Sequence, residues 1–148
     1  MRKTNKQVLG DFGEELIAKQ CSCWNCGRKK TYKKLPKNFK CADLICDFCG
    51  ALSQVKTKTV GDVGIVPDAI LGAAWGPQKE RMDENIYFTL YVVLKEEEKY
   101  SVWILPSRQQ NETLFNARKP LSPEARRAGW QGFSYDLSLF RNVIKRIV

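Results

Sequence analysis

The sequence predicts a single domain of mixed helix and strand, of the α/β or α+β class, over the whole chain of 148 residues. Near the N-terminus, Val8, Phe12 and Leu16 recur at helical spacing. Farther along, residues 86–95 and 100–105 are rich in β-branched and aromatic side chains and are separated by a short charged segment, which indicates a hairpin. We find no repeat, low-complexity tract or flexible linker that would divide the chain.

The same patterns give the order of the elements. Thr4-x-x-Gln7 can form a capping box at the start of the first helix. After residue 105 the patterns weaken and mainly indicate loops. The expected elements are a helix over 4–20, a basic loop over 21–40, strands over 41–46 and 51–58, a helix over 67–82 with a break at Gly76-Pro77, strands over 86–95 and 100–105, a short helix near 123–128 and a final apolar and basic segment.

The chain contains no histidine and carries a net charge of +9, from 25 basic and 16 acidic residues. Without histidine, Ser-His and Cys-His nucleophile pairs and imidazole metal ligands are excluded. Catalysis must then use carboxylates, amides, lysine, or a metal ion held by such groups or by thiolates.

Basic residues are concentrated in two stretches. Seven of the 13 residues in 28–40 are basic and none is acidic, and a second cluster follows over 118–127. A solvated lysine-rich loop and a binding patch explain the first stretch equally well. The second cluster favours a polyanion as the partner. The N-terminal region lacks the apolar core of a signal peptide, so we expect a cytoplasmic, intracellular protein without membrane contact.

Four of the six cysteines form two matched pairs. The spacing Cys23-x2-Cys26, 19 intervening residues and Cys46-x2-Cys49 is that of a four-thiolate zinc site. A thioredoxin-type redox site is the alternative, but such a site does not need two pairs. Four thiolates leave no open position for water, so we expect a structural zinc ion. Cys21 could replace Cys23 as a ligand.

A carboxylate, an amide and a lysine can face one another if the strands over 41–46 and 51–58 are neighbours. Asp43 lies in a short apolar strand, and Gln54 and Lys56 project together from the next one because residues two apart share a face. Such a group can hold a hard divalent cation and a water molecule. Glu15, or alternatively Glu14, could add a third oxygen. The competing interpretation is a solvated polar strand face without chemistry.

These residues belong to segments that resemble known nucleases. Gly13-Glu14-Glu15, Ala42-Asp43-Leu44-Ile45 and Gln54-Val55-Lys56-Thr57-Lys58 resemble the PD-(D/E)XK superfamily, in the Q-x-K variant of the Mrr-like restriction nucleases. The tract over 119–132, the segment over 135–138 and the cysteine motifs are similar to the catalytic domain of the DpnI family of methyl-directed restriction endonucleases. The resemblance extends over residues 8–138.

The resemblance implies both a fold and an activity. The fold would be a restriction-endonuclease-like PD-(D/E)XK core over residues 1–148, with a mixed sheet flanked by helices and with zinc knuckles inserted at 23–49. The activity would be Mg²⁺-dependent cleavage of double-stranded DNA that carries N6-methyladenine in a GATC context, by a prokaryotic or phage-like protein that forms at most a weak homodimer.

The resemblance also implies residue roles. The family pattern assigns Mg²⁺ to Asp43, Gln54 and Val55, the attacking water to Lys56, zinc to Cys23, Cys26, Cys46 and Cys49, and DNA contact to Lys58, Arg126, Arg127 and Trp130. An arginine pair and an aromatic ring suit phosphate contact and stacking or wedging at a base step. A basic surface turn with Trp130 packed into the core is the competing interpretation.

Two departures from the family leave alternatives open. Gln54 stands where the family has glutamate, and an amide oxygen brings no charge to a Mg²⁺ site. The sequence also ends at Val148 without the C-terminal winged-helix domain that the family commonly carries. The first alternative is a zinc-containing DNA-binding module of the same fold with weakened or lost catalysis. The second is a zinc-ribbon protein that contacts RNA or another protein.

Overall fold

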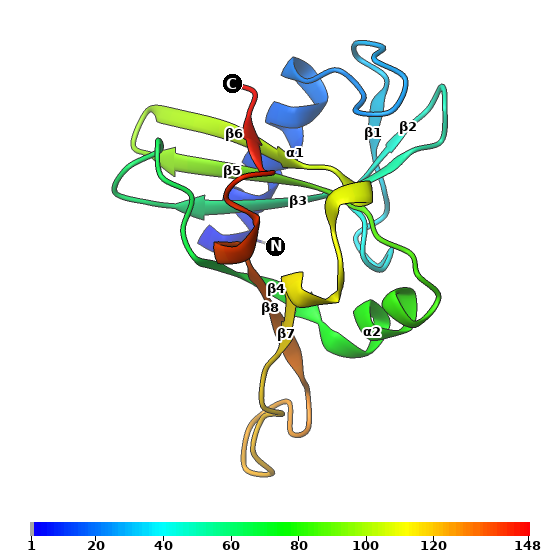
Figure 1. Cartoon of the computed structure of the whole chain (residues 1–148). Coiled ribbons are helices and arrows are strands. Elements are labelled where there is room, and N and C mark those ends of the chain that lie inside the picture. The colour runs from blue at the N-terminus through cyan, green and yellow to red at the C-terminus, as the bar shows by residue number, and fades with distance from the viewer. Residues whose placement is uncertain (1) are drawn as a thin grey trace.

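The computed structural model of the protein describes residues 2–148 and has an α+β architecture around a six-stranded mixed sheet (Figure 1). The strand order is β1-β2-β3-β5-β6-β9, in which β3 and β5 run parallel and the other neighbours run antiparallel. The strands are β1 Tyr32–Lys34, β2 Leu44–Cys46, β3 Leu52–Thr59, β5 Thr89–Glu96, β6 Lys99–Leu105 and β9 Lys145–Arg146. The mixed sheet and the α+β class expected from the sequence are confirmed.

A second sheet is antiparallel and has the order β4-β8-β7. Its strands, together with the two α-helices and the three 3-10 helices, are β4 Ala69–Ala74, β7 Phe115–Ala117, β8 Gly132–Asp136, α1 Asn5–Gln20, α2 Trp75–Asp83, η1 Ser107–Gln109, η2 Glu112–Leu114 and η3 Ser138–Phe140. In Figure 1 the loop between β7 and β8 extends away from the six-stranded sheet.

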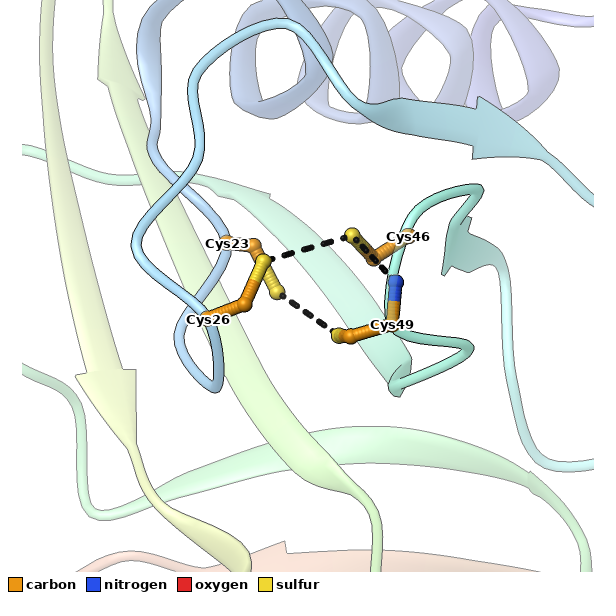
Figure 2. Close-up of side chains that lie close together, drawn as sticks. All are labelled: Cys23, Cys26, Cys46 and Cys49. Carbon is orange, nitrogen blue, oxygen red and sulfur yellow. Dashed lines mark hydrogen bonds between the residues drawn. The ribbon is translucent and has the colours of Figure 1, made fainter.

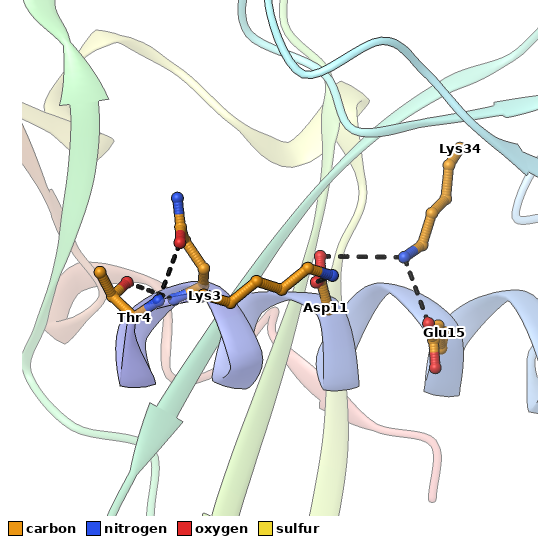
Figure 3. Close-up of polar contacts among 6 residues, drawn as sticks. Lys3, Thr4, Asp11, Glu15 and Lys34 are labelled. Carbon is orange, nitrogen blue, oxygen red and sulfur yellow. Dashed lines mark hydrogen bonds and ion pairs between the residues drawn. The ribbon is translucent and has the colours of Figure 1, made fainter. Parts of the chain in front are cut away.

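Helix α1 begins with the expected capping box. The Thr4 hydroxyl accepts a hydrogen bond from the Gln7 N–H at 3.2 Å, and the Gln7 side chain accepts one from the Thr4 N–H at 2.9 Å (Figure 3). One turn and a half farther on, Gly13 packs directly on Thr57 of β3. A Cβ at position 13 would lie 1.8 Å from the Thr57 Oγ1, so the absence of a side chain is what allows this approach.

Two hydrophobic clusters lie on opposite faces of the six-stranded sheet, and β5 contributes to both. Leu90, Val92 and Leu94 pack in a cluster with buried residues of β4, β7 and β8. Tyr91 and Val93 pack in the other cluster, with α1 and the first cysteines. This alternation is the period of two that a strand buried on both faces requires. The parallel pair β3 and β5 is therefore held from both sides.

Several expected elements differ from the structure. The helix expected over 67–82 is wrong, because β4 occupies its first half and α2 begins at Trp75. Pro77 lies in the first turn of α2, where a missing N–H costs nothing, so Gly76-Pro77 starts the helix instead of breaking it. The helix expected near 123–128 is also wrong, since that segment consists of turns.

Besides β4, four strands were not expected, namely β1 inside the basic loop and β7, β8 and β9 after residue 105. The expected strand over 41–46 is shortened to Leu44–Cys46, and the hairpin expected over 86–105 is confirmed as the antiparallel pair β5 and β6. In the described part of the chain, residues 2–148, neither helix has the length and apolar character needed to cross a membrane.

Candidate functional site

A cleft of 470 Å³ lies where α1, β3 and β4 approach one another. It is lined mainly by polar and basic residues of α1 and β3, by Asp43 just before β2, and by small and apolar residues of β4. The lining residues are Lys6, Leu9, Gly10, Glu14, Asp43, Gln54, Val55, Lys56, Thr57, Lys58, Thr59, Ile70, Leu71 and Gly72. Asp43, Gln54 and Lys56 therefore meet in one cleft.

Asp43 is fixed by the pairing of β2 with β3. Its N–H donates to the Ser53 carbonyl at 2.8 Å, and its own carbonyl accepts a hydrogen bond from the Leu35 N–H at 2.9 Å. The side-chain Oδ2 accepts a hydrogen bond from the Val55 N–H at 2.9 Å. The two strands are neighbours, which was the condition for Asp43 to face Gln54 and Lys56, and in their antiparallel register Leu44 pairs with Ser53. One carboxylate oxygen is thus anchored, which leaves the second for another partner.

Gln54 and Lys56 project from the same face of β3, as the spacing predicts. Their register partners on β5 are Leu90 and Val92, which belong to the cluster beneath the second sheet. Burial lowers the pKa of the Lys56 ammonium, and the negative charge of Asp43 only partly offsets this effect. Lys56 is therefore a lysine whose neutral form is more accessible than in water.

Burial raises the pKa of the Asp43 carboxyl, while the Val55 N–H and the Lys56 charge act in the opposite direction. Glu14 shows the same behaviour, because burial, followed by repulsion from Asp43, raises the pKa of its carboxyl. The anionic form of each side chain is therefore less stable in the cleft than in water. Burial is the main cause in both cases, so a cation bound next to the two carboxyl groups would stabilise their anionic forms.

The third oxygen of the cleft comes from Glu14 and not from Glu15. Glu14 is half-buried and lines the cleft, whereas the Glu15 side chain is 57% exposed and lies 3.5 Å from the Lys34 Nζ. Figure 3 shows Lys34 reaching toward Asp11 and Glu15 along the side of α1. The sequence pattern placed both glutamates near the site. The rotation of α1 about its axis determines which of the two faces the cleft.

Two further residues expected at the site contribute in different ways. The Val55 side chain is buried in the cluster beneath α1, so only its backbone carbonyl is available as a metal ligand. Lys58 is exposed at the far end of the cleft, and its Nζ lies 3.5 Å from the Ala69 carbonyl of β4.

Arg126, Arg127 and Trp130 lie together in the loop between β7 and β8, and none of the three lines the cleft. The Arg127 guanidinium stacks over the Trp130 ring, 4.6 Å from its centroid. Trp130 is half-buried and both arginines are exposed. The loop is tied by the Leu121 N–H, which donates to the Trp130 carbonyl at 2.8 Å. Trp130 is thus a stacked surface residue at the base of a projecting loop.

The four cysteines predicted as zinc ligands come together in space. Their sulfur atoms all lie within 4.8 Å of one another, with 3.6 Å between Cys23 and Cys49 and 3.7 Å between Cys26 and Cys46 (Figure 2). In a tetrahedral zinc site with Zn–S bonds of about 2.3 Å, the sulfurs are separated by about 3.8 Å. All four are free thiols. The cluster is compatible with a zinc site.

Each cysteine pair forms a knuckle of the same shape. The Gly27 N–H donates to the Cys23 carbonyl at 2.9 Å, and the Gly50 N–H donates to the Cys46 carbonyl at 2.8 Å. Both glycines have positive φ, 75° and 80°, which an L-residue adopts only with strain. This repeated turn directs both sulfurs of a pair toward one point.

Neighbouring donors favour ionised sulfur at part of the cluster. Burial acts against ionisation of Cys46, but the hydrogen bond between its sulfur and the Thr31 hydroxyl, together with those from knuckle N–H groups, lowers the pKa of its thiol to about 6. The Asn25 side chain, 3.5 Å from the Cys49 sulfur, lowers the pKa of that thiol as well. Burial raises the pKa of the Cys23 thiol to about 11, a cost that a bound cation offsets.

Cys21 and Cys41 lie outside the cluster. Cys21 is buried in the cluster of apolar residues beneath α1, where burial raises the pKa of its thiol to about 11. It therefore packs as a small apolar side chain, and the structure uses Cys23 in the quartet.

Among the cleft residues that sequence reasoning missed are Lys6 and Gly10 of α1. Together with Glu14 they form the series i, i+4, i+8 on one face of α1, and this spacing is the signal that could have identified them. This spacing was overlooked because only the apolar residues of the helix were used to define the face that packs on the rest of the protein.

A lysine and two partly buried carboxyl groups in one cleft of an α+β fold are typical of nuclease-type enzymes that work with metal ions. Comparison with known families agrees: the chain belongs to the DpnI family, described as the Dam-replacing family, with a match over residues 1–146.

One curated relative supports the same relationship. The UPF0102 protein TTE1452 of Caldanaerobacter subterraneus subsp. tengcongensis is 37% identical over 76 residues. That alignment covers 47% of this chain and 57% of the relative. The chain thus spans little more than half the length of the relative.

Proposed function

We propose that this chain is a Mg²⁺-dependent DNA endonuclease with a restriction-endonuclease-like PD-(D/E)XK core. The observation that carries the proposal is the convergence of Asp43, Gln54, Lys56 and Glu14 in a single cleft. A histidine-free site must obtain its chemistry from such groups and a metal ion. The family match supports DNA as the substrate.

The residues of the cleft fit a hard divalent cation. Asp43, Gln54 and Glu14 offer side-chain oxygens, and Val55 offers its carbonyl, which are the ligand types that Mg²⁺ accepts. The raised pKa values of Asp43 and Glu14 indicate that a cation between them would relieve an existing electrostatic cost. When bound, Mg²⁺ would polarise the phosphodiester and make water more acidic.

Lys56 has a separate role. Burial lowers the pKa of its ammonium, so that it can orient the attacking water and exchange a proton with it. Lys58 and the stacked pair Arg127 and Trp130 offer contacts to the DNA backbone and to a base step, with Arg126 beside them. The zinc ion has a structural role, since four thiolates complete its coordination.

We further infer that the substrate is double-stranded DNA methylated at adenine N6 in a GATC context. The resemblance of residues 119–138 to methyl-directed enzymes and the match to a family described as Dam-replacing support this specificity.

The decisive experiment compares wild-type protein with Lys56→Ala on plasmid from Dam-positive and Dam-negative hosts, with Mg²⁺ present. We expect wild type to cleave only the methylated plasmid and Lys56→Ala to lose at least 100-fold in rate, the order of magnitude that a positioned acid–base group contributes. Intact DNA binding without cleavage in Mg²⁺ or Mn²⁺ would refute the nuclease proposal. Equal cleavage of both plasmids would refute the methyl dependence alone.

A second candidate is a DNA-binding module of the same fold with weakened catalysis. The neutral amide of Gln54, at a position where the family has a carboxylate, favours it. Gln54→Glu separates the two, because an added carboxylate should lower the Mg²⁺ concentration that half-saturates cleavage if position 54 binds the ion. An unchanged Mg²⁺ titration would remove Gln54 from the ligand set.

A further inference from the structure

The two glycines of α1 serve different purposes. Glycine inside a helix is unfavourable, so each needs a reason. Gly13 has one, because a Cβ there would overlap Thr57. Gly10 has no such reason, since a Cβ at this position would meet no heavy atom within 4 Å. Packing therefore does not require glycine at position 10.

Gly10 lies between two cavities. The cleft of 470 Å³ has Gly10 in its lining, and so does a second cavity of 220 Å³ that is bounded by α1 and residues 35–37. The two cavities also share Glu14 and Asp43. The depression thus continues past the two carboxyl groups, and the bare backbone of Gly10 borders it on both sides.

A basic side chain stands at each end of this depression. Lys6 lines the larger cavity, about 6 Å along the helix axis from Gly10, and Lys37 lines the smaller one. Both are exposed, and neither forms an ion pair with any residue in 2–148. By contrast, Lys34, which lies at the surface nearby, is paired with an acidic residue, and so is Lys79 on α2.

We propose that one strand of a nucleic acid crosses the site at Gly10, with Lys6 and Lys37 bound to backbone phosphates on opposite sides of Asp43 and Glu14. The inference rests on the proposed function and assigns it a substrate path. A phosphodiester backbone fits because it places anions on both sides of the reacting bond, while free lysines at both ends supply the matching charges. Glycine at position 10 lets the backbone approach the helix closely.

The first test changes bulk without charge. Gly10→Ala and Gly10→Gln both insert good helix formers, so each should raise the Tm by about 2 to 4 °C. Gly10→Gln should nevertheless weaken binding of a fluorescently labelled duplex oligonucleotide at least tenfold, measured by anisotropy in buffer without added Mg²⁺. Gly76→Gln is the matched control, because Gly76 is an exposed helical glycine with open space around it and lies outside the cleft.

The second test changes charge. Lys6→Gln and Lys37→Gln should each reduce the slope of log Kd against log salt by about one, and the double variant by about two. Lys79→Gln, which removes a lysine paired with Asp83 at 3.0 Å, should leave the slope unchanged.

The outcomes separate this inference from the proposed function. If wild type binds and cleaves DNA while Gly10→Gln, Lys6→Gln and Lys37→Gln bind as tightly as Gly76→Gln and Lys79→Gln, the path is refuted and the nuclease proposal stands. If wild type neither binds nor cleaves methylated or unmethylated duplex, both are refuted.

Discussion

Gly13→Ala tests the contact that sets α1 on the sheet. Two effects oppose each other. Alanine is the better helix former by about 1 kcal/mol. Its Cβ, however, would lie 1.8 Å from the Thr57 Oγ1 and 3.1 Å from the Thr57 Cβ, so α1 would have to withdraw or the strand side chain would have to turn. Overpacking of this kind costs about 1 to 3 kcal/mol, and the severity of the overlap puts the cost near the upper end.

The net expectation is a loss of about 2 kcal/mol in the free energy of unfolding, which corresponds to a fall of about 4 to 8 °C in Tm for a chain of this size. Thermal denaturation followed by circular dichroism measures it, with Gly10→Ala as the control on the same helix. Thr57→Ala removes the overlapping hydroxyl and should recover most of the loss in the double variant. A Gly13→Ala protein as stable as Gly10→Ala would refute the close approach and the position of Glu14 that depends on it.

Three further predictions concern the four-cysteine cluster, the Asp43 carboxyl group and the projecting loop. Native mass spectrometry should show a zinc content well below one equivalent for Cys49→Ser and one equivalent for Cys21→Ser. Equal zinc content in both variants would contradict the assignment of the four clustered cysteines as zinc ligands. Asp43→Asn should raise the Tm at about pH 8 without divalent ions, because a raised carboxyl pKa means that the wild-type fold loses stability as the pH rises. The gain in Tm should vanish near the ordinary pKa of 3.8. A gain independent of pH would contradict the burial argument. Trp130→Ala should weaken duplex binding about tenfold at unchanged Tm, and a large fall in Tm would instead identify Trp130 as a core residue.

The polar group on β3 was predictable because its geometry is local. Gln54 and Lys56 share a face through the period of two, and Asp43 follows from the short connection between two neighbouring antiparallel strands. The cysteine quartet was predictable for a similar reason, since each pair is directed by one turn that ends in glycine. Patterns that act over a few residues were sufficient for these features.

Features that depend on distant contacts were not predictable. Whether Glu14 or Glu15 faces the cleft is decided by the rotation of α1, which the contact of Gly13 with Thr57 fixes. Strand β4 was taken for a helix because Ala69–Ala74 shows no alternation of polar and apolar residues and acquires its strand form by pairing with β8, where Ile70 meets Tyr135.

The parallel pair of β3 and β5 has a consequence for the order of events during synthesis. Asp43, Gln54 and Lys56 leave the ribosome before Thr89, the first residue of the strand that flanks β3. Parallel pairing also forms slowly, because closing the intervening loop costs conformational entropy before the strands gain any stabilising contacts. A nascent chain therefore carries Asp43, Gln54 and Lys56 well before β3 has a partner on that side, and the order of translation itself delays assembly of the cleft.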